Sequence, residues 1–137
     1  MKRRILIIAF LVICAKMLAP GTGEATILRD ESIAPYQKLW EAICLVESHN
    51  NTTALNRKEM AFGVAQIREC RLRDYVKRTG KQLILKDCYD YKTSKSIFMF
   101  YASKYQPDDI LGISRMWNGR SKANRYYAKV KQQLNTI

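Results

Sequence analysis

Glu47 is the residue of this sequence best placed for acid–base chemistry. It follows Trp40 by seven residues and Ile43 by four, so it falls on the apolar stripe of a predicted helix, the face that should be buried. That stripe recurs at steps of three and four residues: Ile33, Tyr36, Leu39, Trp40, Ile43 and Val46. Burial disfavours the charged carboxylate, and a helix C-terminus adds negative potential, so the pKa of Glu47 should be raised. A carboxyl group of this kind is suited to general acid catalysis.

The first 25 residues have the pattern of a secretory signal peptide. Three basic residues at positions 2–4 precede an apolar run over residues 5–15, and small residues lead to an expected cleavage after Ala25. The apolar run is short for a membrane span, which needs about 20 residues, although a retained signal anchor is the alternative. We therefore expect an exported protein of the periplasm or cell envelope, with a single domain over residues 26–137.

The basic charge belongs to the predicted mature chain. Removing residues 1–25 takes away four basic residues and one acidic residue, which leaves 20 Lys and Arg against 11 Asp and Glu and a net charge of +9. Such a charge attracts polyanions, and for an exported chain the cell envelope is the expected source. Basic residues are spread through the sequence, and Arg68, Arg71 and Arg73 are interpreted as a solvated helix face.

Three cysteines follow the predicted cleavage site, so at most two of them can pair. Cys44 lies in the core helix, where a free thiol behaves as a small hydrophobic residue, and Cys70 with Cys88 is the candidate pair. Spacing alone does not decide whether that bond forms. No Cys and His spacing resembles a metal site, and we expect no metal and no cofactor.

The remaining patterns predict a mainly α domain of about four to six helices with irregular connections. Ser32 is expected to cap a first helix over residues 33–48, which the polar run after it ends. A second helix should end at Gly80, a third should start at Ser94 and end before Pro107, and residues 110–117 and 121–134 should form the last two. The segments 49–59 and 81–91 read as a polar loop and as an extended connection.

Three blocks in order resemble the motif series of the soluble-type lytic transglycosylases, which are related to goose-type lysozyme. The blocks are Glu47-Ser48 with Asn51 and Ala54, then Ala61-x-Gly63-x-x-Gln66, then Trp117-Asn118-Gly119 with Tyr126 and Val130. The resemblance implies a lysozyme-like, mainly helical fold. It also implies peptidoglycan glycan strands as the substrate; partners in envelope assembly stay open, and no nucleic acid is expected.

The resemblance implies that Glu47 is the single catalytic acid and base. It would protonate the glycosidic oxygen between N-acetylmuramic acid (MurNAc) and N-acetylglucosamine (GlcNAc), then accept a proton from the muramyl 6-hydroxyl as that oxygen closes onto the anomeric carbon. The products would carry 1,6-anhydro-MurNAc ends. One carboxyl group suffices because the substrate supplies its own nucleophile.

Five further positions correspond to substrate-contacting or supporting residues of the family. Ser48 would hydrogen-bond beside Glu47, or simply satisfy backbone groups at the helix end. Gln66 would contact sugar, against the alternative of a surface amide. Asn118 matches the family's asparagine, and Trp117 replaces the usual tyrosine while keeping an aromatic wall.

The fifth position is a tyrosine whose hydroxyl approaches the catalytic glutamate. Tyr126 matches it best, because Val130 follows at the expected offset, whereas a register error would exchange it with Tyr127. Gly63 is expected to provide room for the backbone. His49 is the only histidine, and a histidine in a polar turn is expected to be exposed.

Two other readings compete with the transglycosylase. A hydrolytic muramidase needs a second carboxylate, for which Glu59 in the polar loop is a candidate. A non-catalytic peptidoglycan-binding protein could keep the fold, although it would not need Glu47. A membrane-active or nucleic-acid-binding protein would need a clustered basic face, which the sequence does not predict.

Overall fold

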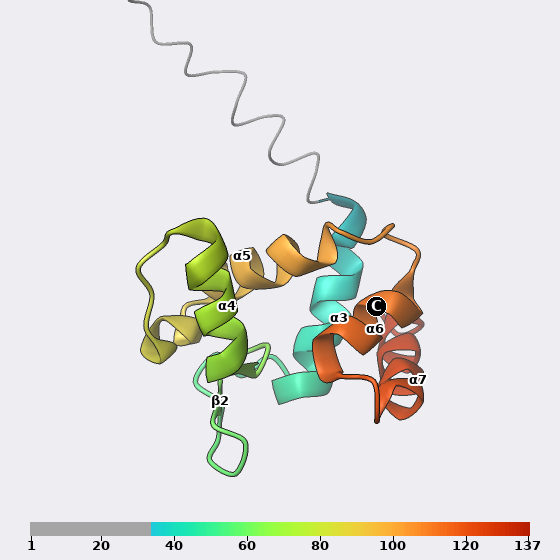
Figure 1. Ribbon diagram of the computed structural model, residues 1–137. Helices are drawn as coiled ribbons and strands as arrows, with labels where there is room; N and C mark the ends of the chain where they lie inside the picture. Colours follow the sequence, from blue (N-terminus) through green and yellow to red (C-terminus); the bar gives the residue numbers. More distant parts are fainter. Residues whose placement is uncertain (1–33) are drawn as a thin grey trace, which may run out of the picture. The chain divides into compact units, whose positions relative to one another are not determined.

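Residues 34–137 are described by a computed structural model and form a mainly helical small domain, as predicted (Figure 1). The predicted signal peptide of residues 1–25 lies outside the described residues, as do Ser32 and Ile33 at the expected start of the first helix. The described elements, in chain order, are η1 (Ala34–Tyr36), α3 (Gln37–Ser48), β1 (Leu55–Asn56), β2 (Ala61–Phe62), β3 (Ile67–Arg68), α4 (Glu69–Thr79), η2 (Leu85–Tyr89), α5 (Tyr91–Ala102), α6 (Ile110–Asn118) and α7 (Ala123–Leu134).

The helix α3 carries Glu47 and ends at Ser48, as the sequence predicts. His49 and Asn50 stop it because both adopt left-handed backbone conformations, with φ of 55° and 63°. Their N–H groups turn back to the carbonyl groups of the last helical turn. His49 is exposed, as expected for a residue in this polar turn.

The three strands form a small antiparallel sheet in the order β1-β2-β3, which the sequence did not predict. Residues 55–56 were expected to be loop, yet Leu55 pairs with Phe62 and Asn56 with Ala61. Phe62 in turn pairs with Ile67, so β2 is the central strand. Two-residue strands are too short to give an alternating pattern, and of the six strand residues only Ala61 and Ile67 are buried.

The helix α4 ends at Thr79, and Gly80, with a left-handed φ of 70°, is the predicted C-cap. The connection that follows is not fully extended, because residues 85–89 form the 3-10 helix η2. Leu83 and Leu85 of this connection pack against the core.

The N-cap of the helix α5 lies four residues earlier than predicted. Asp90 is its N-cap, and one carboxylate oxygen accepts a hydrogen bond from the Thr93 N–H at 2.7 Å. Ser94, the predicted cap, is instead buried inside the helix and donates to the Cys88 carbonyl oxygen at 2.6 Å. The helix ends at Ala102, before Pro107 as predicted.

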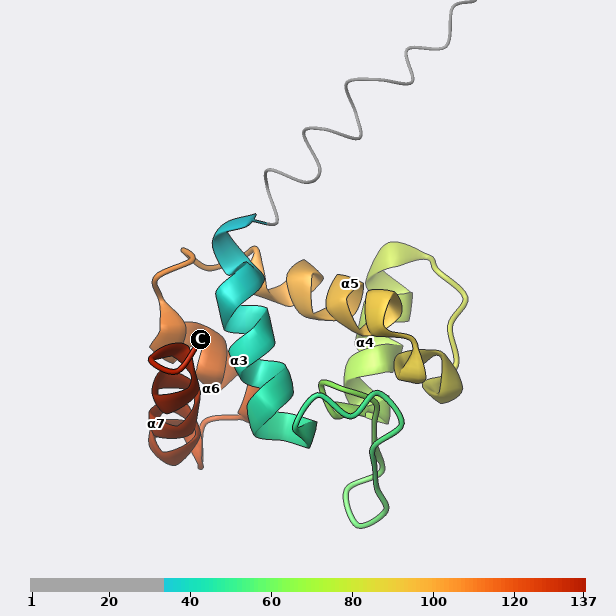
Figure 2. The ribbon, with the colours of Figure 1, turned by 180° about the vertical axis from the view of Figure 1, so that it is seen from behind.

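The helices α6 and α7 pack against each other, and α7 also packs against α3. Figures 1 and 2 both place α3 between this pair and the part of the domain formed by α4 and the sheet. In α7, Ala123, Tyr126 and Val130 are buried at steps of three and four residues, so this stripe faces the core.

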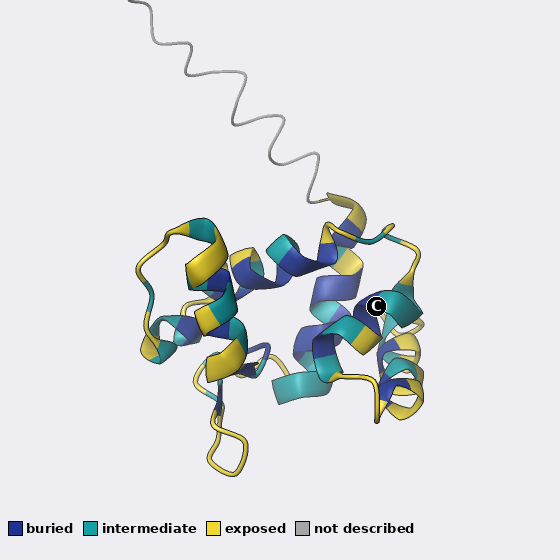
Figure 3. Cartoon of the chain, viewed as in Figure 1, coloured by how far each residue is buried: buried dark blue, intermediate teal, exposed yellow. Residues whose placement is uncertain are grey.

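The core is centred on Trp40, which is fully buried on α3 and packs against the rings of Phe98 and Tyr91. Figure 3 shows buried residues concentrated on α3, α5 and α6, whereas the tip of the β1–β2 hairpin is exposed. Within residues 34–137, the apolar stretches of the helices are too short for any of them to cross a membrane.

Candidate active site

Glu47 lies in the last turn of α3, where the helix meets both the sheet and α7. Its neighbours on the stripe, Trp40 and Ile43, are completely buried, and Glu47 itself is mostly buried at the edge of that core. The prediction that this carboxyl group falls on the buried face of the helix is confirmed.

Tyr126 of α7 donates a hydrogen bond from its hydroxyl to Oε1 of Glu47 at 2.7 Å. Tyr126 is buried, since it lies on the core stripe of α7, whereas Tyr127 is only half-buried and has its ring near Lys131. Of the two tyrosines that the sequence left open, the structure thus brings Tyr126 to Glu47. No second hydrogen bond from the described residues occupies the carboxyl group, so Oε2 is available to a ligand.

The pKa of Glu47 is raised from 4.5 to about 7, and burial is the largest cause. The negative charge of Glu59 also raises this pKa. The hydrogen bond from Tyr126 acts in the opposite direction, followed by the charges of Arg68 and Arg71. Burial also raises the pKa of Tyr126, so its hydroxyl keeps the proton that it donates. Near neutral pH, Glu47 can therefore both give and accept a proton.

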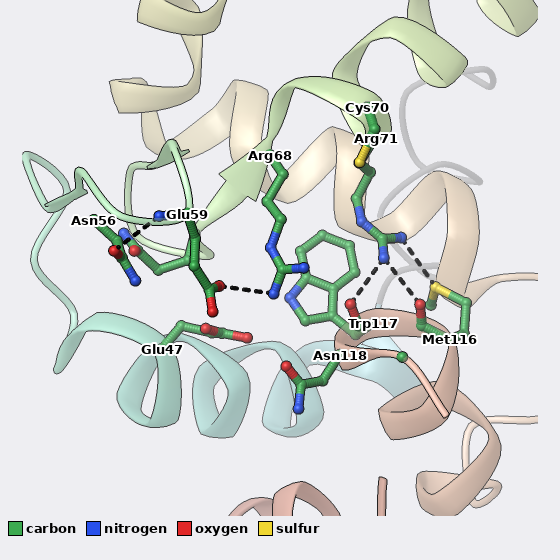
Figure 4. Close-up of a pocket in the computed structure, with 11 residues that line it drawn as sticks. Glu47, Asn56, Glu59, Arg68, Cys70, Arg71, Met116, Trp117 and Asn118 are labelled. Carbon is green, nitrogen blue, oxygen red and sulfur yellow. Dashed lines mark hydrogen bonds and ion pairs between the residues drawn. The ribbon is translucent and has the colours of Figure 1, made fainter. Parts of the chain in front are cut away.

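A pocket of about 230 Å³ opens in front of Glu47 (Figure 4). Its walls come from α3, the β1–β2 hairpin, β3, α4 and the end of α6. The lining residues are Glu47, Asn56, Glu59, Gln66, Arg68, Cys70, Arg71, Met116, Trp117, Asn118 and Gly119. Three of the predicted substrate-contacting residues, Gln66, Trp117 and Asn118, are thus brought together with Glu47.

Gln66 is held in the pocket wall by a tight turn. Its own φ is 51°, its N–H donates to the Gly63 carbonyl oxygen at 3.1 Å, and its side-chain Nε2 donates to the same oxygen at 2.9 Å. Gly63 has a φ of 74°, and a side chain there would overlap the carbonyl oxygen of Cys88. Gly63 therefore provides room for the backbone, as predicted, and lets the turn that carries Gln66 pack on η2.

Ser48 does not line the pocket. Its hydroxyl donates to the Val64 carbonyl oxygen at 2.8 Å and lies 3.3 Å from the Cys44 carbonyl oxygen. Of the two roles open to it from the sequence, the structure favours the structural one. The hydroxyl ties the end of α3 to the turn that leads to Gln66, so Ser48 positions the site without facing it.

Arg71 is a component of the site that the sequence did not reveal. It was expected on a solvated helix face, yet it is mostly buried and donates to the Met116 and Trp117 carbonyl oxygens at 2.9 and 2.8 Å. Its guanidinium carbon also lies 4.3 Å from the centre of the Trp117 ring and 5.0 Å from that of Tyr101. Arg71 thus joins α4 to the C-terminal end of α6, and Arg73 alone of the cluster is plainly solvated away from the pocket.

Trp117 is only 6% exposed, so it serves mainly as a wall of the pocket. Its indole N–H donates to the Ala65 carbonyl oxygen at 3.3 Å, and the guanidinium of Arg71 covers the ring. Asn118, the last residue of α6, has its amide side chain at the pocket, beside Trp117 in Figure 4. Because no described residue hydrogen-bonds that amide, Asn118 is the freer of the two to bind a ligand.

Glu59 and Arg68 form an ion pair of 2.8 Å across the mouth of the pocket (Figure 4). Their side chains are 42% and 47% exposed, and an exposed pair of this kind stabilises a fold by only about 0–1 kcal/mol. Both charges act on the pKa of Glu47, in opposite directions. The pair is therefore more important for the electrostatics of the pocket than for stability.

Cys44, Cys70 and Cys88 are all free thiols, so the candidate bond between Cys70 and Cys88 is not formed. Cys70 is exposed on α4 at the pocket, whereas Cys88 is buried in η2. Burial raises the pKa of Cys88 to about 12 and that of Cys44 further still, so both behave as small apolar groups. Within residues 34–137, no three acidic, His or Cys side chains gather as metal ligands.

Comparisons of the chain with known protein families, with curated proteins and with solved structures find no match. The function proposed below therefore rests on the geometry of the pocket and on the sequence motifs that its residues carry.

Replacing Tyr126 with Phe tests the contact at the base of the pocket. The variant loses the hydrogen bond that lowers the pKa of Glu47, so this pKa should rise. Losing this donor is more destabilising when the buried carboxylate is ionised than when it is protonated. We therefore expect the free energy of unfolding to fall by about 1.5–3 kcal/mol above neutral pH and by about 1 kcal/mol in acid. NMR titration of the Glu47 carboxyl group checks the first result and denaturant unfolding the second. Tyr127→Phe is the matched control, and an unchanged Glu47 pKa in Tyr126→Phe would contradict the assignment.

Proposed function

We propose that this protein is an exported peptidoglycan lytic transglycosylase with a lysozyme-like fold. In this proposal it cleaves the MurNAc-GlcNAc β-1,4 bond, forms 1,6-anhydro-MurNAc ends and uses Glu47 as the only acid and base. The observation that carries the proposal is the state of Glu47. This carboxyl group lies in a pocket wall, has a pKa of about 7 and is held at one oxygen by Tyr126.

In this reaction one carboxyl group acts first as an acid and then as a base. The protonated Glu47 gives its proton to the glycosidic oxygen, the bond from that oxygen to the anomeric carbon breaks, and GlcNAc leaves with a free 4-hydroxyl group. The muramyl 6-hydroxyl oxygen then bonds to the anomeric carbon and returns a proton to Glu47. No water is consumed, and Glu47 is restored. A pKa near the working pH suits both proton transfers.

The rest of the pocket supports the binding of a polar, uncharged sugar. Asn118 presents an amide group that can donate to and accept from hydroxyl and acetamido groups, whereas the amide nitrogen of Gln66 is held by backbone carbonyl groups and its oxygen is left to accept. Trp117 forms an apolar wall that Arg71 fixes in place. Tyr126 holds Oε1 of Glu47, which leaves Oε2 to reach the glycosidic oxygen.

Incubation of the protein lacking residues 1–25 with purified peptidoglycan tests the proposal. We expect the release of soluble muropeptides, and release should fall as the pH rises above about 7, because Glu47 must start protonated. Sedimentation with peptidoglycan but no release would assign the protein to the binding-only class and contradict the proposal.

Hydrolysis is the second candidate, and Glu59 is the observation that favours it. This carboxylate lines the same pocket as Glu47 and acts on its pKa. A hydrolase would use such a group as nucleophile or as the base for water. Against this role, Glu59 is paired with Arg68, so its charge is already engaged.

The variant Glu59→Gln separates the two candidates. For the transglycosylase we expect a rate within about threefold of the wild type, whereas loss of a catalytic base would cost on the order of a hundredfold or more. The high-pH limit of activity should also move to lower pH, because removal of the Glu59 charge lowers the pKa of Glu47. Arg68→Gln should move the same limit to higher pH. Initial rates of muropeptide release across a pH series measure the rate of Glu59→Gln and the high-pH limits of both variants. A loss of about a hundredfold or more in the Glu59→Gln rate would favour hydrolysis.

A further inference from the structure

A group of basic side chains surrounds the connection between α6 and α7. Arg115, Arg120, Lys122 and Arg125 line two neighbouring hollows of the surface, and no acidic residue among residues 34–137 lines either one. We refer to these four residues as the basic rim. The sequence did not predict a clustered basic face, because the four positions are spread over eleven residues and two helices.

The basic rim is not neutralised by the part of the chain that the structure describes. All four side chains are exposed, and none of them forms an ion pair or a side-chain hydrogen bond with residues 34–137. Residues 110–137 contain six Lys or Arg and no Asp or Glu. Elsewhere, Arg68 and Arg78 each have a carboxylate partner, and Arg71 binds backbone carbonyl groups. Unpaired like charges repel one another, so an anionic ligand would be favoured here.

The basic rim continues from the pocket that contains Glu47. Met116 lines both that pocket and the hollow that also contains Tyr105. Arg115 and Arg120 line this hollow and the neighbouring one. Asn118 and Gly119, at the end of α6, lie in the pocket wall and immediately precede Arg120 of the rim in sequence. A polymer bound in the pocket can therefore extend over the basic rim.

We infer that the basic rim binds the carboxylates of the peptide stems on the glycan strand, so that the protein prefers peptide-bearing glycan to naked glycan. This inference rests on the proposed function, and it specifies the substrate class. In peptidoglycan, the MurNAc that the proposed function places in the pocket is joined to a peptide stem with free carboxylates, and this stem projects from the strand beside the cleaved bond. Arginine is the side chain best suited to carboxylates, because its planar fork donates two parallel hydrogen bonds. Three of the four rim residues are arginines.

The test compares two variants with equal loss of charge. The rim variant replaces Arg115, Arg120, Lys122 and Arg125 with Gln, and the control variant replaces the exposed Arg73, Lys77, Lys86 and Lys92, which line none of the three cavities. Each is assayed on intact peptidoglycan and on glycan strands stripped of peptides by an amidase. On intact peptidoglycan we expect the rim variant to lose about tenfold in kcat/KM, since four exposed contacts of a few tenths of a kcal/mol each are removed. On stripped strands, which keep only the lactyl carboxylate of each MurNAc, it should lose much less, and the control variant should lose little on either substrate.

A second readout is binding without turnover, measured by sedimentation of each variant in the Glu47→Gln background with both materials and with a DNA oligonucleotide. Protein with the wild-type rim should sediment more with intact peptidoglycan than with stripped strands. Raising the salt to about 0.5 M should remove that preference. Equal losses of the rim variant on intact and stripped material, no loss at all, or a stronger effect on DNA than on peptidoglycan would each overturn the inference. If the wild type releases nothing from either substrate, the proposed function fails, and the sedimentation result still decides whether the rim recognises peptide stems.

Discussion

Glu47→Gln is expected to lower the rate of muropeptide release by at least about a thousandfold. A positioned general acid or base contributes on the order of a hundredfold to ten-thousandfold, and here one group performs both tasks. The amide cannot give a proton to the glycosidic oxygen, although its oxygen can still accept the hydrogen bond from Tyr126. Initial rates on purified peptidoglycan measure the loss. Glu41→Gln is the matched control, because Glu41 lies on the same helix and lines no part of the pocket.

The same variant should be more stable than the wild type above neutral pH. The folded-state pKa of Glu47 is about 7 against 4.5 for the free group, so between these values the folded protein keeps a proton that the unfolded chain has released. The free energy of unfolding of the wild type therefore falls as the pH rises through this window, by about 3 kcal/mol in full. Denaturant unfolding should show Glu47→Gln gaining about 2–3 kcal/mol over the wild type at about pH 8 and little at about pH 4. An advantage that does not grow with pH would contradict the raised pKa.

Gly63→Ala is expected to be the most destabilising small substitution near the site, at about 3 kcal/mol or more. The new methyl group would overlap the carbonyl oxygen of Cys88, which is already engaged by the buried Ser94, and the left-handed φ of Gly63 adds strain. Relief requires the turn carrying Gln66 to move away from η2, so the pocket wall should be disturbed as well. Denaturant unfolding gives the first effect, and the KM for peptidoglycan should rise with it.

Gly80→Ala is the control for this prediction. Gly80 has a similar φ of 70°, but no atom lies within 4 Å of the position that a side chain would take. Its replacement should cost only the backbone strain, about 1 kcal/mol. If both variants lost the same free energy of unfolding, the close packing of Gly63 on Cys88 would not be the cause.

Local sequence patterns were sufficient to place Glu47 on the buried face of its helix. The helical stripe through Trp40 and Ile43 determines which face of α3 is buried, and Glu47 falls on that face. This inference succeeds because it depends on one helix alone. Tyr126 was expected only through the resemblance to the family motif, and the choice between it and Tyr127 needed the packing of α7 on α3.

The sequence did not predict features that depend on two segments far apart in the chain. Arg71 is buried only because the carbonyl groups of Met116 and Trp117 come to meet it from α6. Asp90 and Ser94 are both good N-cap residues, and the choice between them follows from the bond of Ser94 to Cys88. The basic rim, too, exists only once α6 and α7 have packed side by side.

The mass of the ends left on released muropeptides tests the central claim most directly, since it reports what attacks the anomeric carbon. The account predicts 1,6-anhydro-MurNAc ends, lighter by one water molecule than reducing ends, in the products of the wild type and none with Glu47→Gln. Reducing ends carrying the added water as the main product would contradict it, because they would mean that water, activated by a second carboxylate, completes the reaction.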